Sequence, residues 1–133
     1  MPRQRLEHSQ QVLFFRRLAL DSRTRNLAIC AVPNFSGRLG RATAIHGAYL
    51  KAEGRKPGVP DILCFNSGRE WSLQGAPELR NGLALEMKHG KNKTTPLQEW
   101  WLQELRLCGW RVNVVYGAEE AWNVLLDYLG VGE

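Results

Sequence analysis

The chain has 133 residues and a mass of 15.1 kDa, with 44% hydrophobic and 23% charged residues and a formal net charge of +5. This length and composition are typical of one globular domain over residues 1–133, and they leave no room for a second domain. The longest apolar run, Leu27 to Val32, is far shorter than the roughly 20 residues that span a bilayer, and no cysteines are spaced as CxxC, so we expect neither a membrane segment nor a disulfide or cysteine-built zinc framework.

The spacing of apolar residues predicts a mixed α/β domain in which helices cover a central sheet. Between two paired strands, Asn66 to Gly82 is expected to be an irregular surface excursion, because its glycines and proline break any period. In chain order the predicted elements are a helix over Glu7–Leu20, a strand over Leu27–Val32, a helix over Ala42–Glu53, strands over Asp61–Phe65 and Leu83–Lys88, a helix over Pro96–Cys108, a strand over Arg111–Tyr116 and a helix over Glu119–Leu129.

The predicted helices carry apolar stripes that indicate their buried faces. The expected core positions are Val12, Phe15, Leu18 and Ala19 in the first helix, Leu97, Trp101, Leu105 and Cys108 in the third, and Ala121, Trp122, Leu125 and Leu129 in the last. Thr95, Pro96 and Gln98 form a capping-box pattern at the start of the third helix. Trp100 and Leu107 fall on another flank, where exposed apolar side chains favour a protein interface.

Charge is divided unevenly along the chain. Residues 1–60 hold eleven Lys and Arg and three Asp and Glu, a net charge of +8, whereas residues 61–133 hold seven and ten, a net charge of −3. A basic half beside an acidic half is typical of a polyanion-binding surface joined to a carboxylate-bearing site. A solvated helical face rich in arginine is the alternative.

Side chains alternate along a strand, so Glu86 and Lys88 share one face of the predicted Leu83–Lys88 strand. By itself this Glu-x-Lys pair is most simply an ion pair on a sheet surface. The neighbouring strand changes that interpretation because it opens with Asp61 and is otherwise apolar. A buried carboxylate needs a partner, and two carboxylates on adjacent strands can share a hard divalent cation such as Mg²⁺. With a lysine beside them, they predict a site that cleaves phosphodiester bonds.

These motifs resemble the VRR-Nuc branch of the PD-(D/E)xK phosphodiesterase superfamily, and the likeness covers nearly the whole chain. The residues that carry it are Glu7 and Gln11, Val32-Pro33-Asn34, Lys51-Ala52-Glu53-Gly54, Gly58-Val59-Pro60-Asp61, Glu86-Met87-Lys88, Thr95-Pro96-Leu97-Gln98 with Trp100 and Trp101, Gly109-Trp110-Arg111-Val112 and Glu119-Glu120-Ala121. The chain looks like the compact stand-alone form found among phage-encoded members.

The resemblance implies a restriction-endonuclease-like core and a set of site residues. Asp61, Glu86 and the backbone carbonyl of Met87 would bind Mg²⁺ or Mn²⁺, and Lys88 would be the catalytic lysine. Glu7 and Gln98 would join the same site, with Glu7 also a metal ligand. For Glu7 the alternative is an exposed helix acid. For Gln98 it is the capping box, which we do not expect one side chain to combine easily with a role in the site.

Several other residues are candidates for contact with DNA. They are Lys51, Arg55 and Lys56 before the Asp61 strand, His89, Lys91 and Lys93 after the Glu-x-Lys strand, and Asn34 in the Pro-Asn turn. Ordinary loop solvation explains the basic residues equally well, and Asn34 could serve only to shape its turn.

Together these features favour a metal-dependent DNA endonuclease that acts on branched replication and repair intermediates, such as Holliday junctions or flaps, as well as on duplex DNA. A homodimer is expected, since two active sites could address two strands. The expected location is the cytoplasm, that of a bacterial host if the gene belongs to a phage. The alternatives are a non-cleaving DNA-binding or architectural protein and an RNA-directed nuclease of the same fold.

Overall fold

The computed structural model describes residues 3–33 and 51–131, with side chains from residue 6 onward. The predicted helix Ala42–Glu53 therefore lies largely outside the described residues, as does Asn34. The described end of that helix, from Lys51, closes in a turn in which the Gly54 N–H donates to the Lys51 carbonyl at 3.0 Å. Gly54 has φ 95°, a left-handed conformation that favours glycine and ends a helix.

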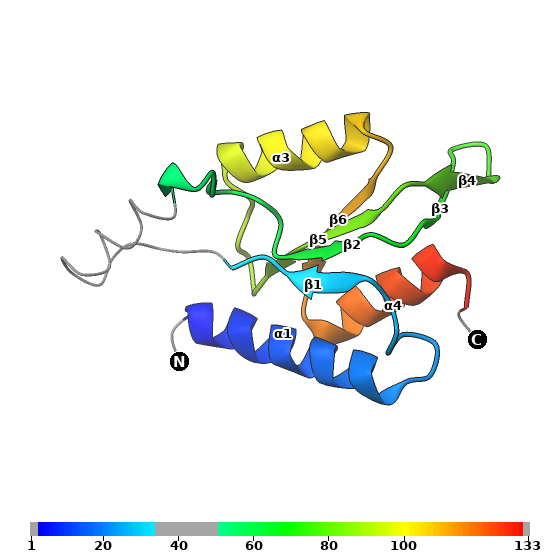
Figure 1. Cartoon of the computed structure of the whole chain (residues 1–133), viewed down its shortest axis with the longest axis horizontal. Coiled ribbons are helices and arrows are strands. Elements are labelled where there is room, and N and C mark those ends of the chain that lie inside the picture. Colours follow the sequence, from blue (N-terminus) through cyan, green and yellow to red (C-terminus); the bar gives the residue numbers. More distant parts are fainter. Residues whose placement is uncertain (1–2, 34–50, 132–133) are drawn as a thin grey trace.

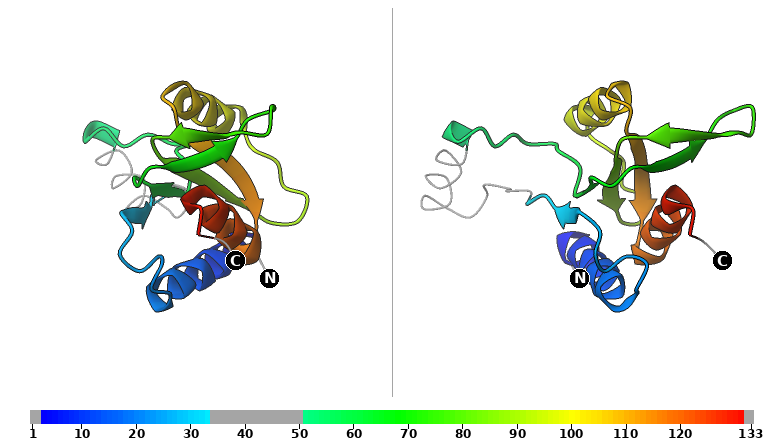
Figure 2. Two further views of the ribbon diagram at one scale, coloured as in Figure 1. Left: turned by 90° about the vertical axis from the view of Figure 1, so that its right-hand side faces the viewer. Right: turned by 45° about the vertical axis from the view of Figure 1, so that its right-hand side comes forward.

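A four-stranded mixed sheet forms the centre of the domain, with strands in the order β1-β2-β5-β6. Strands β5 and β6 are parallel, and the other two pairings are antiparallel. Helix α3 covers one face, and α1 and α4 cover the other (Figures 1 and 2). This arrangement confirms the predicted α/β architecture. The elements are α1 Arg3–Leu20, β1 Ile29–Ala31, β2 Ile62–Cys64, β3 Gly68–Trp71, β4 Pro77–Arg80, β5 Leu83–Lys88, α3 Pro96–Leu107, β6 Arg111–Tyr116 and α4 Ala118–Leu129.

Strand β5 separates two apolar layers. Leu83, Leu85 and Met87 pack into the larger core with α1 and α4, whereas Ala84 packs beneath α3. The alternation places Glu86 and Lys88 on the α3 face, as predicted. The sheet therefore buries most of the Glu86 and Lys88 side chains.

Two of the predicted core stripes are confirmed only in part: Leu18 is buried and Phe15 and Leu105 pack against the core, but other positions differ. In α1 the buried residues are Phe14 and Leu18, while Ala19 is exposed. In α3 the buried residue is Leu102, whereas Leu97 and Cys108 are exposed. One residue corresponds to 100° of helix rotation, so a stripe displaced by one position faces a different neighbour. The N-terminal turns of α3 lean instead on the 57–58 loop, where Trp101 Nε1 donates to the Pro57 carbonyl at 3.0 Å.

The last helix buries the three predicted residues Ala121, Trp122 and Leu125, but Leu129 only in part. Tyr128 is completely buried as well, and its hydroxyl donates to the Asn66 carbonyl at 2.6 Å. The aromatic ring supplies core area while its polar end satisfies a loop carbonyl. The apolar stripe alone does not reveal such a residue.

The segment Asn66–Gly82 is not irregular, contrary to the prediction. It forms a β3–β4 antiparallel hairpin that projects from the sheet (Figure 1). Two of its glycines permit close packing: a Cβ at Gly68 would lie 2.5 Å from the Tyr128 ring, and one at Gly82 would lie 2.5 Å from Trp110. A proline at the first position of a short, exposed strand is likewise compatible with pairing.

Strand β1 is an exposed edge strand and not the buried strand that its composition predicts. Cys30 on β1 is exposed, and all three cysteines are free thiols. No helix in the described part of the chain is long and apolar enough to cross a bilayer.

Candidate active site

The pairing of β2 with β5 brings Asp61 to Glu86. The observed register aligns Ile62 with Leu85, and one further step places Asp61 opposite Glu86. Residues directly opposite on antiparallel strands project to the same face, with Cβ atoms about 4.5–5.5 Å apart. The two acids are therefore neighbours on the α3 face of the sheet.

Asp61 lies immediately before the first residue of β2, and its side chain takes the place of a backbone partner for β5. Its Oδ2 atom accepts a hydrogen bond from the Met87 N–H at 2.7 Å. Because the N–H and C=O of one strand residue point to the same edge, the Met87 carbonyl also faces the Asp61 side. The carbonyl and the Asp61 side chain therefore lie on the same side of β5.

Glu86 is the most unusual group in the site. It is 1% exposed, its Oε2 atom has no hydrogen-bond partner within the described residues, and its Oε1 atom lies 3.6 Å from Lys88 Nζ. Burial, together with the nearby charge of Asp61, raises the pKa of Glu86 to about 8, although Lys88 opposes the shift. A buried carboxylate oxygen without a partner is costly unless a cation is bound.

Gln98 performs two tasks with one atom. Its Oε1 accepts from Lys88 Nζ at 2.9 Å and from the Thr95 N–H at 2.9 Å, while the Gln98 N–H donates to Thr95 Oγ1 at 3.2 Å. The capping box and the lysine contact are therefore compatible, contrary to the expectation from sequence. A carbonyl oxygen has two lone pairs, so it can accept both donors.

Glu7 reaches the same cleft from α1, but its observed partner is in another loop. Its Oε1 atom accepts from Asn92 Nδ2 at 3.3 Å. The cleft has a volume of about 580 Å³ and is lined by Glu7, His8, Gln11, Ala31, Val32, Pro33, Asp61, Glu86, Met87, Lys88 and Gln98. Sequence reasoning assigned no role to His8, because a lone histidine has no partner at ligand spacing along the chain.

The donor set fits one hard divalent cation. Within residues 3–33 and 51–131 no three His, Cys, Asp or Glu side chains gather closely enough to hold a metal. Two carboxylates and one backbone carbonyl are nevertheless oxygen ligands of the kind that Mg²⁺ takes, with water completing its shell. The partnerless Glu86 oxygen is the observation that favours such an ion.

The predicted DNA contacts fall into two exposed groups near this end of the sheet. Lys51, Arg55 and Lys56 precede β2, whereas His89, Lys91 and Lys93 follow β5. Both segments lie beyond the end of β5 that carries Lys88 (Figure 1).

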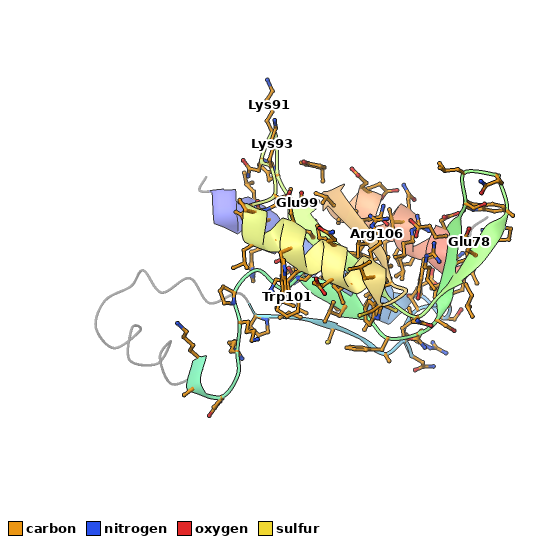
Figure 3. All side chains as sticks on the ribbon, turned by 90° about the horizontal axis from the view of Figure 1, so that it is seen from above. Glu78, Lys91, Lys93, Glu99, Trp101 and Arg106 are labelled. Carbon is orange, nitrogen blue, oxygen red and sulfur yellow. The ribbon has the colours of Figure 1, made fainter. Side chains whose placement is uncertain are left out.

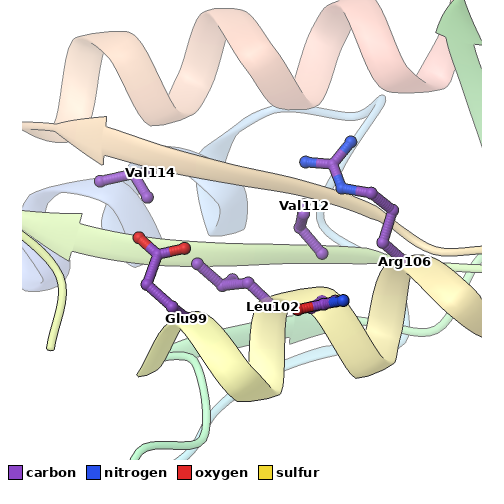
Figure 4. A pocket seen from close by; sticks show the side chains of 6 residues that line it. Glu99, Leu102, Arg106, Val112 and Val114 are labelled. Carbon is purple, nitrogen blue, oxygen red and sulfur yellow. The ribbon is translucent and has the colours of Figure 1, made fainter. Parts of the chain in front are cut away.

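A second, smaller cavity of about 270 Å³ lies between α3 and β6. Leu102, Val112 and Val114 line it with Glu99 and Arg106 at either side (Figure 4). It has a single carboxylate and no second acid to share a cation, so it lacks the chemistry of the larger cleft.

Comparisons with known proteins agree with the observed fold. A family model described as the VRR-NUC domain matches residues 5–119. A solved structure described as a VRR_NUC domain protein has a TM-score of 0.71 and 22% sequence identity, over 96% of this chain and 91% of that chain. At that identity the likeness shows the fold. No curated protein matches the chain.

The Glu86 pKa predicts how the stability of the metal-free protein depends on pH. In EDTA the native state should hold a proton on Glu86 between its ordinary pKa of 4.5 and about 8, while the unfolded state releases it. The contribution of protonated Glu86 to the free energy of unfolding is then fully present below pH 4.5 and is lost as pH rises through about 8. Thermal unfolding of wild type and Glu86→Gln across pH 5–9 checks this: we expect the midpoint to fall with pH for wild type relative to the variant.

Glu120→Gln removes an exposed carboxylate and serves as the control. A wild-type profile parallel to that of Glu86→Gln would contradict the assignment of the raised pKa to Glu86.

Proposed function

The chain belongs to the VRR-NUC domain family, a nuclease family, and on that basis we propose that it is a metal-dependent DNA endonuclease that hydrolyses phosphodiester bonds. The observation that carries the proposal is the convergence of Asp61 and Glu86 from adjacent strands beside Lys88, with one buried Glu86 oxygen lacking a partner. A module that only binds DNA gains nothing from carboxylates at the surface that meets phosphate.

Mg²⁺ or Mn²⁺ is the proposed cofactor. Asp61, Glu86 and the Met87 carbonyl would hold it. When bound, such an ion offsets the negative charge of a phosphate and lowers the pKa of water. Glu7 stays a candidate additional ligand through the oxygen that Asn92 does not contact.

Lys88 is the proposed catalytic lysine, and Gln98 determines where its amine lies. The Nζ atom contacts Gln98 Oε1 and Glu86 Oε1, so two elements fix its position. The ammonium can donate a hydrogen bond to the attacking water and attract the charge that builds on the phosphate. The attacking water gives up one proton as its oxygen forms the new bond to phosphorus, the bond to the leaving sugar oxygen breaks, and that oxygen takes up a proton.

DNA is the proposed substrate, bound by the exposed basic residues around the cleft. The +8 charge of residues 1–60 supports it, because phosphate contacts release counterions. Branched replication and repair intermediates are the proposed preference. A homodimer would suit them by presenting two sites, and Trp100 and Leu107 on α3, 50% and 74% exposed, are the proposed interface residues. Light scattering on the eluted protein gives its mass in solution.

Removal of one site carboxylate tests the activity. We expect Asp61→Asn to reduce the rate of cleavage by about a hundredfold or more, which is the usual effect of removing one group that stabilises a transition state. DNA binding in EDTA should survive. Lys88→Ala should behave alike. Cleavage of plasmid and four-way-junction DNA is measured with Mg²⁺, Mn²⁺ or EDTA, with Glu120→Gln as control.

Equal cutting by Asp61→Asn and wild type would contradict the proposed site. Cutting of RNA but not DNA would favour an RNA-directed nuclease, and binding without cutting by wild type would favour an architectural protein.

The two tasks of Gln98 can be separated by comparing Gln98→Ala with Thr95→Ala. Both variants disrupt the capping box, which is worth about 0.5–2 kcal/mol of stability, so both should lower the unfolding midpoint. Only Gln98→Ala removes the acceptor that holds the Lys88 amine. We therefore expect kcat to fall in Gln98→Ala and to stay near wild type in Thr95→Ala. Equal kcat in the two variants would show that the lysine contact has no part in catalysis.

A further inference from the structure

Asn92 makes three hydrogen bonds that help to hold the loop between β5 and α3 in place. Its N–H donates to the His89 carbonyl at 3.2 Å, and its own carbonyl accepts from the Tyr116 hydroxyl at 2.9 Å. Its side-chain Nδ2 donates to Glu7 Oε1 at 3.3 Å. Asn92 thus joins its own loop to the end of β6 and to α1.

The same contacts determine where two lysines point. Asn92 is half-buried, while its neighbours Lys91 and Lys93 are exposed. The bond from the Asn92 N–H to the His89 carbonyl closes a turn, and the lysines on either side of the inward-facing Asn92 face solvent. Figure 3 shows Lys91 and Lys93 pointing away from the body of the protein, beyond the N-terminal end of α3.

The far end of the loop is fixed as well. Thr94 Oγ1 donates to Glu99 on α3, and Thr95 is the N-cap of that helix. Bonds to the surrounding elements therefore hold the loop on both sides of Lys93. An ordered loop has less conformational freedom to lose when it binds a ligand.

The loop begins at the active site. Lys91 follows Lys88 by three residues, which span at most about 11 Å even when fully extended. Measured along the helix axis, that distance corresponds to about three nucleotides of one DNA strand, at 3.4 Å per nucleotide. The two lysines are thus within reach of phosphates next to one bound at Lys88.

We propose that Asn92, together with Glu7 and Tyr116, is a positioning unit that holds Lys91 and Lys93 against the DNA backbone flanking the scissile phosphate. The inference rests on the proposed nuclease function. It gives Glu7 a role that does not require a metal: its carboxylate anchors the loop from α1. Asn92 and Tyr116 act through the lysines and do not touch the reacting atoms.

A donor–acceptor reversal tests the unit. Asn92→Asp places a carboxylate against Glu7, which should release the loop and weaken DNA binding about fivefold. Adding Glu7→Gln restores an amide–carboxylate pair in the opposite sense, and binding should return to within about twofold of wild type. Adding Glu120→Gln to Asn92→Asp restores the same net charge without restoring the pair, so it should not rescue.

Binding is measured in EDTA on a four-way junction and on duplex DNA over a range of salt concentrations, so that cleavage does not contribute. The double variant Lys91→Ala, Lys93→Ala should make the negative slope of log K against log salt shallower by about 1.8, because each phosphate contact contributes about 0.9 to its magnitude. Tyr116→Phe, which removes only the hydroxyl, should weaken binding in the same direction as Asn92→Asp. Asn123→Asp on the exposed side of α4 controls for added charge.

Backbone NMR relaxation of Lys91 and Lys93 in the free protein measures the loop without DNA. We expect order in wild type and in the Glu7→Gln rescue, and mobility in Asn92→Asp. Loss of rescue, an ordered loop in Asn92→Asp, or an unchanged salt slope in the double lysine variant would each overturn the inference. An ordered loop in a wild-type protein that binds no DNA would contradict the proposed function instead.

Discussion

The burial of Glu86 beside Asp61 is the constraint on which the rest of the structure depends. Two carboxylates and one ammonium carry a net charge of −1 when all are ionised, in a place where the Glu86 side chain is almost without solvent. Without a further cation, this arrangement favours the protonated form of Glu86 and raises its pKa. A bound divalent cation would offset this charge, so the unfavourable burial of Glu86 is the observation that favours a metal site here.

The fold serves to hold these groups still. Strand β5 has an apolar layer on each face, which fixes the direction in which Glu86 and Lys88 project. The β2–β5 register then sets Asp61 opposite Glu86, and the start of α3 brings Gln98 to the lysine. Because each contact comes from a different element, loss of packing in any one of them would displace a site residue.

Sequence reasoning predicts this arrangement best where a simple period applies. Alternation along Leu83–Lys88 puts Glu86 and Lys88 on one face, and the acid at the start of an apolar strand joins them because that strand pairs with β5. The prediction from sequence fails where tertiary contacts determine the local structure. Gly68 and Gly82 allow close packing in a hairpin and do not mark an irregular loop. Asn92 carries no signal of its own, because its partners Glu7 and Tyr116 lie 85 and 24 residues away.

Titration with Mn²⁺, followed by the loss of the free-ion signal in electron paramagnetic resonance, tests the central claim most directly. Binding requires no DNA and no turnover, so it reports on the carboxylates alone. Wild type should bind Mn²⁺ with an affinity that rises as pH passes 8 and Glu86 ionises, whereas variants lacking the Asp61 or the Glu86 carboxylate should bind far more weakly. Equal Mn²⁺ affinity in wild type and both variants would contradict a cation shared by Asp61 and Glu86.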